Sequence, residues 1–240
     1  MDRDHSMKLV GEVALAAAAI GCQIAHQRVG YDAGFMWVDL VGVPPMLAAY
    51  LWGPRAGMRV LLAPVLWILL VEPVGWIGAG FKASATLAAM VAASRPSARL
   101  LAGGALVAAV LLAGGTGLLV AAAGPVTEAI GAAALAAPLV AAAIVWAQSN
   151  RGRTSLSVAW RPLLLAVGCA IVLRGSLMVI ADLLFAFPVF FGVPAGSALS
   201  TQPPWSIFVW NGVQAAVDVA AAGVVAGWCH RPERHSERGP

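Results

Sequence analysis

Long apolar runs that contain almost no charged residues narrow the possible folds of this chain more than any other feature. A run of roughly 17 to 25 apolar residues is long enough to cross the hydrocarbon core of a bilayer as a helix. Candidate runs lie near residues 8–26, 37–53, 57–72, 75–93, 99–123, 126–147, 161–190 and 205–229. Inside hydrocarbon, only helices and closed barrels satisfy their backbone hydrogen bonds. The sequence therefore predicts an all-α polytopic membrane helix bundle of about eight spans.

The composition agrees with a membrane protein and argues against a soluble domain. Hydrophobic residues make up 60% of the chain, charged residues 11%, and the mean hydropathy is +0.84, whereas about a quarter of the residues of a soluble domain are charged. The net charge of +4 does not indicate nucleic-acid binding, because the basic residues lie mostly between the apolar runs. The expected surrounding is a lipid bilayer, with no nucleic-acid partner.

The basic residues also predict the topology. With the N-terminus in the cytoplasm, twelve Lys and Arg residues of the gaps and tails fall on the cytoplasmic side and only Arg28 on the outer side, as the positive-inside rule requires. This predicts a multi-pass protein of the plasma membrane with both termini cytoplasmic, provided that no run is a re-entrant dip. The run 8–26 is expected to be a span rather than a signal peptide, since Asp2 and Asp4 interrupt the basic head.

The stretch 34–57 combines features that are costly inside a membrane. Asp39 stands at the head of an apolar run, Pro44-Pro45 mark a point where a helix begins or breaks, and Gly53-Pro54 mark its end. In hydrocarbon, a freed backbone group needs a partner and an ionisable side chain needs a polar cavity. The stretch is therefore a candidate functional site.

The same stretch resembles a known pattern. In the riboflavin-type substrate-binding subunits (S components) of energy-coupling factor (ECF) vitamin transporters, the segment joining the first two transmembrane helices typically reads F-x-x-x-D-L-S-D-x-P-A-L-x-x-x-x-x-G-P-x-A-G. The chain differs at Gly42, where that family often has a second Asp. It matches at Phe35, Asp39, Leu40, Pro44, Gly53, Pro54, Ala56 and Gly57.

Two later blocks continue the resemblance in the same order. The block 172–194 is similar to the fifth helix of the family, with Asp182 where an Asn is usual. The block 208–217 is similar to the closing segment, with Asn211 matching and Gln214 in place of a Lys; Lys82 stands where the fourth helix usually has an Asn. Together with the opening stretch, these blocks cover about half of the chain.

The resemblance implies one membrane domain, 1–240, built on a six-helix S-component-like core. Residues 8–93 would form helices 1–4 of this core, and residues 154–240 its last two helices and a cytoplasmic tail. Since riboflavin-type S components usually have six spans, the apolar segment 94–153 would be an inserted helical hairpin.

Polar residues from several runs are expected at a similar depth. At about 1.5 Å per residue, Lys82, Asn211 and Gln214 lie about 9 to 13 Å from the outer ends of their runs. Asp182 lies in the outer third of its run, and Asp39 lies at the outer mouth of its own. Transporters build substrate sites from such groups where helices are broken. The predicted substrate-binding residues are these five and three aromatic residues expected to stack on a planar ring: Asp39, Lys82, Asp182, Asn211, Gln214, Trp37, Trp76 and Trp210.

Other roles remain open for some of these residues. Asp39 is also placed to cap a helix N-terminus, and Lys82 and Asp182 are candidates for a mutual buried salt bridge. Arg174 and Asp218 are expected at similar distances from the cytoplasmic ends of their runs. They are interpreted as a structural ion pair beneath the site, with direct contact to a ligand as the alternative.

A face of small residues in the first run is a candidate partner-docking surface. Its members are Ala14, Ala17, Ala18 and Gly21, spaced four apart in two pairs, and such spacing lets helices approach closely. Ordinary internal packing explains the same pattern. The ECF resemblance favours the docking role, because the first helix of an S component docks against the membrane subunit of the transporter.

Signals for enzymatic chemistry are missing from the sequence. There is no Walker A sequence, no H-E-x-x-H and no G-x-G-x-x-G, so the expectation is no enzyme activity, no cofactor and no metal. Cys22, Cys169 and Cys229 are interpreted as small hydrophobic residues. The predicted function is the substrate-specific subunit of an ECF-type importer that captures a vitamin-like small molecule, riboflavin being the first guess, with an ECF transmembrane subunit and two ATPase subunits as partners. The alternatives are a stand-alone secondary transporter and a membrane enzyme or assembly factor.

Overall fold

The structure is a computed structural model of a helical protein with one very short β-hairpin. It describes residues 3–29, 31–32, 37–72, 75–94, 96–97, 100, 105, 160–192 and 204–229. Its elements are α1 (Arg3–Val29), β1 (Tyr31–Asp32), β2 (Trp37–Val38), α2 (Val43–Trp52), α3 (Pro54–Val71), α4 (Gly75–Ser94), α7 (Trp160–Ala181), the π-helix η1 (Asp182–Ala186), α8 (Phe187–Phe191) and α10 (Pro204–Cys229). β1 and β2 pair in antiparallel register, Tyr31 with Val38 and Asp32 with Trp37. The expected hairpin 94–153 lies almost wholly outside the described residues.

Four described helices are long and apolar enough to cross a membrane: His5–Ala25, Pro54–Val71, Pro162–Val189 and Ser206–Cys229. They coincide with four of the predicted runs and are consistent with a helical membrane protein. A fifth run, 75–93, is also a continuous helix, α4. The total of six core spans, or eight with the hairpin, stays a prediction.

The predicted span 37–53 needs a correction. Its helix, α2, has only 10 residues, about 15 Å at the usual helical rise, and the hydrocarbon core of a bilayer is about 30 Å thick. Residues 39–42 lie outside any helix, and the helix begins only at Val43. Since α2 is too short to cross alone, the strict alternation of sides that the count of basic residues assumed does not follow for this run.

Proline and glycine define both ends of α2. Pro44 and Pro45 occupy its first turn, where a missing N–H group leaves no hydrogen bond unmade. Gly53 alone joins α2 to α3 with φ +93°, a conformation that glycine adopts without strain. A Cβ on Gly57 would lie 2.7 Å from the Pro45 carbonyl oxygen and 2.9 Å from the Ala49 Cβ. The absence of a side chain at Gly57 therefore lets α3 pack closely on α2.

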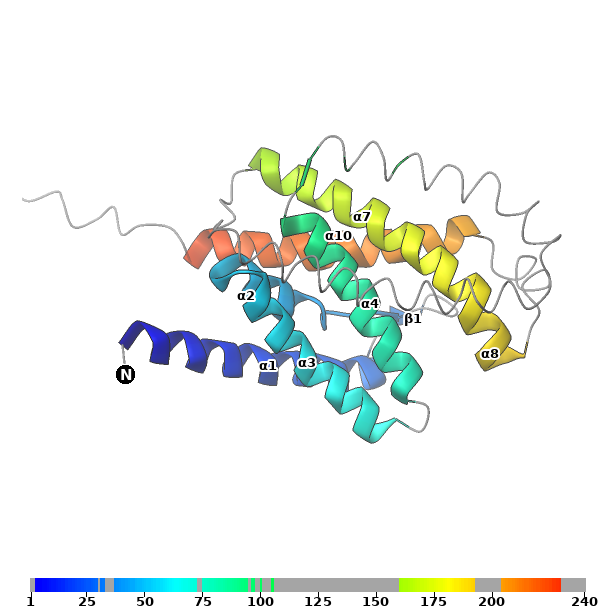
Figure 1. Cartoon of the computed structure of the whole chain (residues 1–240), viewed down its shortest axis with the longest axis horizontal. Coiled ribbons are helices and arrows are strands. Elements are labelled where there is room, and N and C mark those ends of the chain that lie inside the picture. The colour runs from blue at the N-terminus through cyan, green and yellow to red at the C-terminus, as the bar shows by residue number, and fades with distance from the viewer. Residues whose placement is uncertain are drawn as a thin grey trace, which may run out of the picture.

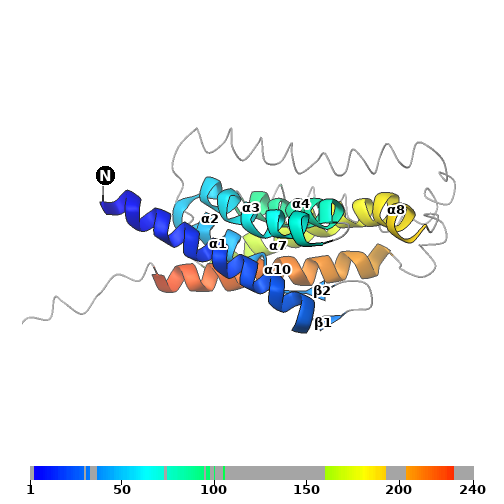
Figure 2. The same cartoon turned by 90° about the horizontal axis from the view of Figure 1, so that it is seen from below.

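The helices form a bundle in which neighbours in space are often distant in sequence (Figures 1 and 2). α7 packs against α10 and α4, α2 lies between α3 and α10, and α1 packs against α3 and α2. The start of α1 and the end of α10 lie at the same end of the bundle in both views. Both α2 and β2, the strand just before it, contact α10.

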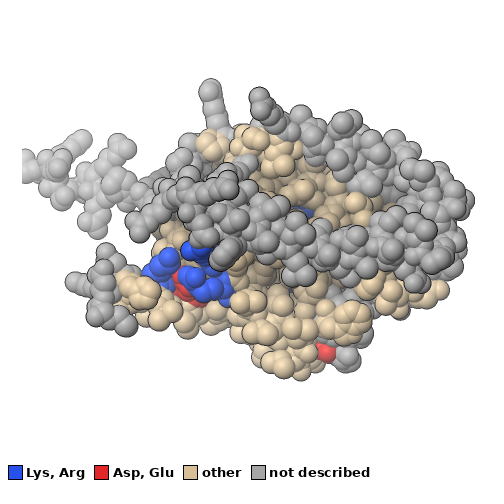
Figure 3. Space-filling view, viewed as in Figure 1, with Lys and Arg blue, Asp and Glu red and all other residues tan. Residues whose placement is uncertain are grey.

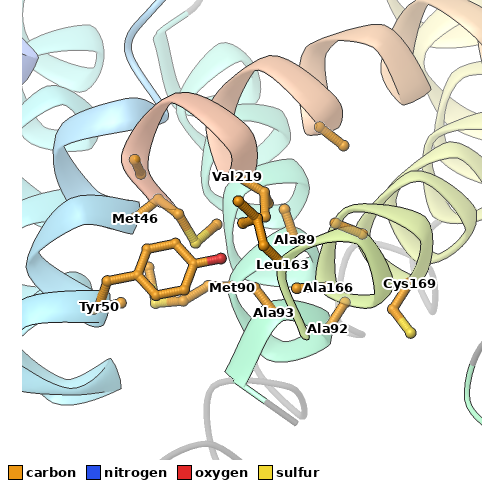
Figure 4. Close-up of a cluster of buried hydrophobic side chains, with 14 of the residues drawn as sticks. Met46, Tyr50, Ala89, Met90, Ala92, Ala93, Leu163, Ala166, Cys169 and Val219 are labelled. Atoms are coloured by element: carbon orange, nitrogen blue, oxygen red, sulfur yellow. The ribbon is translucent and has the colours of Figure 1, made fainter. Parts of the chain in front are cut away.

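The main hydrophobic core lies where α2, α4, α7 and α10 meet (Figure 4). Alanine supplies most of its buried side chains: Ala49, Ala89, Ala92, Ala93, Ala166, Ala170, Ala215, Ala222 and Ala226. Met46, Tyr50, Met90 and Leu163 fill the remaining space. Small side chains let helix backbones approach closely, which is the usual basis of helix packing in membranes. Cys169 is buried in this core, as expected for a small hydrophobic residue, whereas Cys229 is exposed.

One turn of the α7–α8 helix is a π-helix. Within η1, the Phe187 N–H group donates to the carbonyl oxygen of Asp182, five residues earlier. Pro188 follows in the first turn of α8, where its ring removes one donor from the helical ladder. π-turns are rare and occur often at functional sites, so the position of Asp182 at the start of this turn is notable.

Candidate functional site

Asp39 is the centre of the candidate site. Its carboxylate Oδ2 pairs with the Lys82 ammonium of α4 at 2.5 Å, and its Oδ1 accepts a hydrogen bond from the Val41 N–H group at 2.8 Å. The side chains of Lys82 and Asp39 are only 16% and 3% exposed. The capping alternative for Asp39 is wrong, because α2 has Gly42 at its N-cap and no side-chain cap. The mutual Lys82–Asp182 salt bridge is also wrong, since Lys82 pairs with Asp39.

Gln214 of α10 binds the main chain of Asp39 from the other side. Its Oε1 accepts from the Asp39 N–H group at 2.9 Å, and its Nε2 donates to the Asp39 carbonyl oxygen at 2.6 Å. The same Nε2 donates to Asp218 Oδ1 at 2.9 Å. A single amide therefore satisfies both backbone groups of a non-helical residue and joins it to an acid one turn further along α10.

The predicted ion pair of Arg174 and Asp218 is present. Arg174 Nη1 lies 2.8 Å from Asp218 Oδ2, with side chains 6% and 1% exposed. Gly42 makes room for this carboxylate, since a Cβ there would lie 2.2 Å from Asp218 Oδ2. The helix start at Gly42 and the acid on α10 are thus in direct contact.

These contacts form one chain of side chains, which we call the buried polar network: Lys82, Asp39, Gln214, Asp218 and Arg174. A cation stands at each end, an anion follows on each side, and the Gln214 amide joins the two anions, so the formal charge of the network is zero. A buried charge is tolerated when it is paired and hydrogen-bonded. The network joins α4, the segment before α2, α10 and α7 in the interior of the bundle.

Asp182 and Asn211, two other predicted site residues, are buried. Asp182 lies at the start of the π-turn. Asn211 is 1% exposed, and its Nδ2 donates to the Ile207 carbonyl oxygen of its own helix at 3.0 Å. Their roles as substrate-binding residues stay predictions.

The aromatic residues proposed to stack on a ring are spread over three elements. Trp76 of α4 is 61% exposed, Trp210 of α10 is half-buried, and Trp37 lies in β2, where the structure does not describe its side chain. A stack of these three rings around one ligand also stays a prediction.

The small-residue face of α1 points away from the bundle. Ala14, Ala17, Ala18 and Gly21 are all exposed, and a Cβ on Gly21 would meet nothing within 4 Å. Internal packing, the alternative explanation of this face, is therefore not what these residues do in the structure. The face is available to a partner or to lipid.

Two polar contacts were missed by the sequence analysis. Arg59 of α3 makes a two-pronged contact with Glu12 of α1, at 2.7 and 2.6 Å, and Gln23 of α1 donates to Glu72 at the end of α3 at 3.3 Å. Arg59 was counted only as a topology signal. The apolar periodicity around Glu12 and Gln23 gave no sign of a partner 47 or 49 residues away.

The contact between Glu12 and Arg59 is part of a group of charged side chains on the surface. In Figure 3, Lys and Arg side chains gather beside an acidic group near the first half of α1. The described residues there include Lys8, Glu12 and Arg59. Among the described residues, no group of three or more His, Cys, Asp or Glu side chains is arranged to hold a metal ion.

Comparison of the chain with known proteins gives no match to a protein-family model, to a curated protein or to a solved structure. Functional inference therefore depends on the residues and their contacts.

Proposed function

We propose that this protein is the solute-capture subunit of an ECF-type importer in the plasma membrane. It would bind a small vitamin-like molecule from the outside, and riboflavin is the first ligand to test. An ECF transmembrane subunit and two ATPase subunits would supply the driving force, since the sequence has no Walker A motif of its own.

The observation that carries this proposal is the meeting of two segments that resemble the family, the opening stretch and the closing block, with Lys82 of α4. Asp39 belongs to the opening stretch, Lys82 to the fourth helix and Gln214 to the closing block, and both Lys82 and Gln214 bind Asp39. Asp39 and Gln214 are 175 residues apart in sequence. The opening stretch and the closing block, which both resemble the family, therefore meet at Asp39, and Lys82 pairs with the same residue.

The departures from the family pattern favour a rearranged site over a lost one. The family has a Lys where this chain has Gln214, and an Asn where it has Lys82, so the cation has moved from one neighbour of Asp39 to another. The second family Asp is replaced by Gly42, and the Asp218 carboxylate occupies the space that a Cβ there would need. The same kinds of charge surround Asp39, supplied from different helices.

The exposed small-residue face of α1 supports the proposed partners. A helix whose small residues face outward permits close packing with another membrane helix. In the assembled importer this face would contact the ECF transmembrane subunit.

Purification in detergent followed by spectroscopy tests the proposal. A flavin that co-purifies would absorb in the near ultraviolet and blue, and riboflavin added to flavin-free protein would quench tryptophan fluorescence to saturation. A colourless protein whose tryptophan emission does not respond to riboflavin would remove that ligand.

A pair of variants tests the charge exchange. Lys82→Asn leaves Asp39 without its cation and should weaken ligand binding at least tenfold, as expected for a charged hydrogen bond of about 1.5–3 kcal/mol. Adding Gln214→Lys returns the cation to the side where the family has it, and should recover most of the affinity. If the double variant binds no better than Lys82→Asn, the two positions are not equivalent.

A stand-alone secondary transporter is the second candidate, and the buried polar network favours it. Ionisable residues buried in apolar helices often mark ion pathways. Proteoliposomes that contain only this chain distinguish the two functions. Solute uptake driven by an ion gradient would support a secondary transporter, whereas uptake only with the ATPase-bearing partners supports the capture subunit.

A further inference from the structure

A buried amide on α1 lacks one of its hydrogen bonds. Gln23 is 3% exposed, and its Nε2 donates to Glu72 Oε1 at 3.3 Å. Its Oε1 has no hydrogen-bond partner among the residues that the structure describes. A buried acceptor without a donor costs about 1–3 kcal/mol, so a bound molecule that supplies a donor would be favoured here.

Other polar groups lie close to this acceptor. A Cβ on Gly78 of α4 would lie 3.2 Å from Glu72 Oε2, so α4 passes directly beside the carboxylate. Lys82 lies four residues after Gly78, on the same face of α4. Cys22, which precedes Gln23, lies within electrostatic range of both Asp39 and Lys82. The end of α1, the end of α3 and the first half of α4 thus bring Gln23 near the Asp39–Lys82 pair.

The charges around Gln23 select the chemistry of a ligand. The acceptors are the Gln23 carbonyl oxygen and the Glu72 carboxylate, and the donor is the Lys82 ammonium, which can form three hydrogen bonds and gives one to Asp39. An ammonium group on the ligand would be repelled by Lys82, and a carboxylate by Glu72 and Asp39. An uncharged hydroxyl both donates and accepts, and therefore fits every group present.

We propose that Gln23, with Glu72 and Lys82, forms a subsite for the hydroxyl groups of an uncharged polyol chain. The subsite rests on the proposed function in that it would hold the sugar-alcohol part of the captured solute, while its ring lies elsewhere in the bundle. Gln23 was not among the residues that the sequence analysis selected for binding.

A comparison of two flavins measures the contribution of the subsite separately from that of the rest of the ligand. Riboflavin carries a ribityl chain, and lumiflavin has a methyl group in its place. Gln23→Met keeps the length of the side chain but removes its polar atoms. We expect it to weaken riboflavin binding about tenfold, as for one lost hydrogen bond, and to change lumiflavin binding less than twofold. Ile24→Leu, at the next position of α1, controls for local damage and should leave both affinities unchanged.

The outcomes distinguish the two proposals. If Gln23→Met binds riboflavin as well as the natural chain does, or weakens both flavins equally, the hydroxyl subsite is wrong while the capture function stands. If neither flavin binds the natural protein, flavin capture fails, and ribitol decides on the subsite. Ribitol should then raise the melting temperature of the natural protein more than that of Gln23→Met, and equal shifts in the two proteins would overturn the subsite.

Discussion

Two sets of charged side chains join helices in this protein, and they differ in how deeply they are buried. The Glu12–Arg59 pair links α1 to α3, and the side chain of Arg59 is 54% exposed whereas that of Glu12 is 8% exposed. The Arg174–Asp218 pair of the buried polar network has side chains 6% and 1% exposed. An exposed pair contributes little, because water replaces either partner. Removing one partner of a buried pair leaves an uncompensated charge. Burial, and not the number of ion pairs, should therefore decide which charges stabilise this bundle.

The two sets also differ in what they connect. Glu12 and Arg59 lie 47 residues apart on α1 and α3, helices that already pack through apolar side chains. Asp39 and Gln214 lie 175 residues apart and join the start of the bundle to its last helix. The buried polar network therefore holds together more distant parts of the chain than the Glu12–Arg59 pair does.

The largest effect is expected from Arg174→Met. The variant leaves Asp218 buried without its cation, which should lower the free energy of unfolding by about 3–5 kcal/mol. Chemical denaturation in detergent micelles measures the change. The double variant Arg174→Met/Asp218→Leu removes both charges and should recover most of the loss. A single variant as stable as the natural protein would show that burial does not separate the two sets.

Gln214→Met should have the next largest effect. It leaves the Asp39 N–H and carbonyl groups without their partner, at about 1–3 kcal/mol for each buried group, and the same denaturation measurement applies. Val213→Ala lies on the exposed side of the same helix and should change stability by no more than about 0.5 kcal/mol. Equal losses for the two variants would mean that the amide does not hold the Asp39 segment.

Gly42→Ala tests the contact between the start of α2 and Asp218. The added Cβ would lie 2.2 Å from Asp218 Oδ2, and relief of this overlap should cost about 1–2 kcal/mol. Gly21→Ala is the matched control, because a Cβ there meets nothing within 4 Å and alanine favours a helix by about 0.5–1 kcal/mol. Opposite signs in thermal unfolding are expected, and a stabilised Gly42→Ala would contradict the contact.

Arg59→Gln should have the smallest effect. Because the Arg59 side chain is 54% exposed, the loss should be at most about 1 kcal/mol, and it should shrink as salt is added. Thermal unfolding at two ionic strengths measures both. A loss as large as that of Arg174→Met would remove the distinction between the exposed and the buried set.

Several features of the site follow from sequence reasoning. The pairing of Arg174 with Asp218 was predicted because each lies deep in its own apolar run, where an unpaired charge is costly. The start of α2 near Pro44 and its end at Gly53 follow from the backbone limits of these two residues. These predictions depend on single residues and on depth along a helix, which the chain itself specifies.

The partners of Lys82, Asp39 and Gln214 were not predictable in the same way. Depth along the membrane normal places several acids within reach of Lys82, but the rotation and packing of each helix decide which one it meets. Lys82 was considered as a partner of Asp182, and it pairs with Asp39. The length of α2 was overestimated, since an apolar run does not reveal that its first residues are held by a side chain of α10.

Composition and the order of apolar runs are enough to make this chain a helical membrane protein, because hydrocarbon forces the backbone of each segment to satisfy its own hydrogen bonds. The depth of each polar residue follows from the same runs. The identity of each buried pair was decided by the tertiary structure alone, since contacts between α4, α10 and the segment before α2 depend on how closely their small residues let the helices approach.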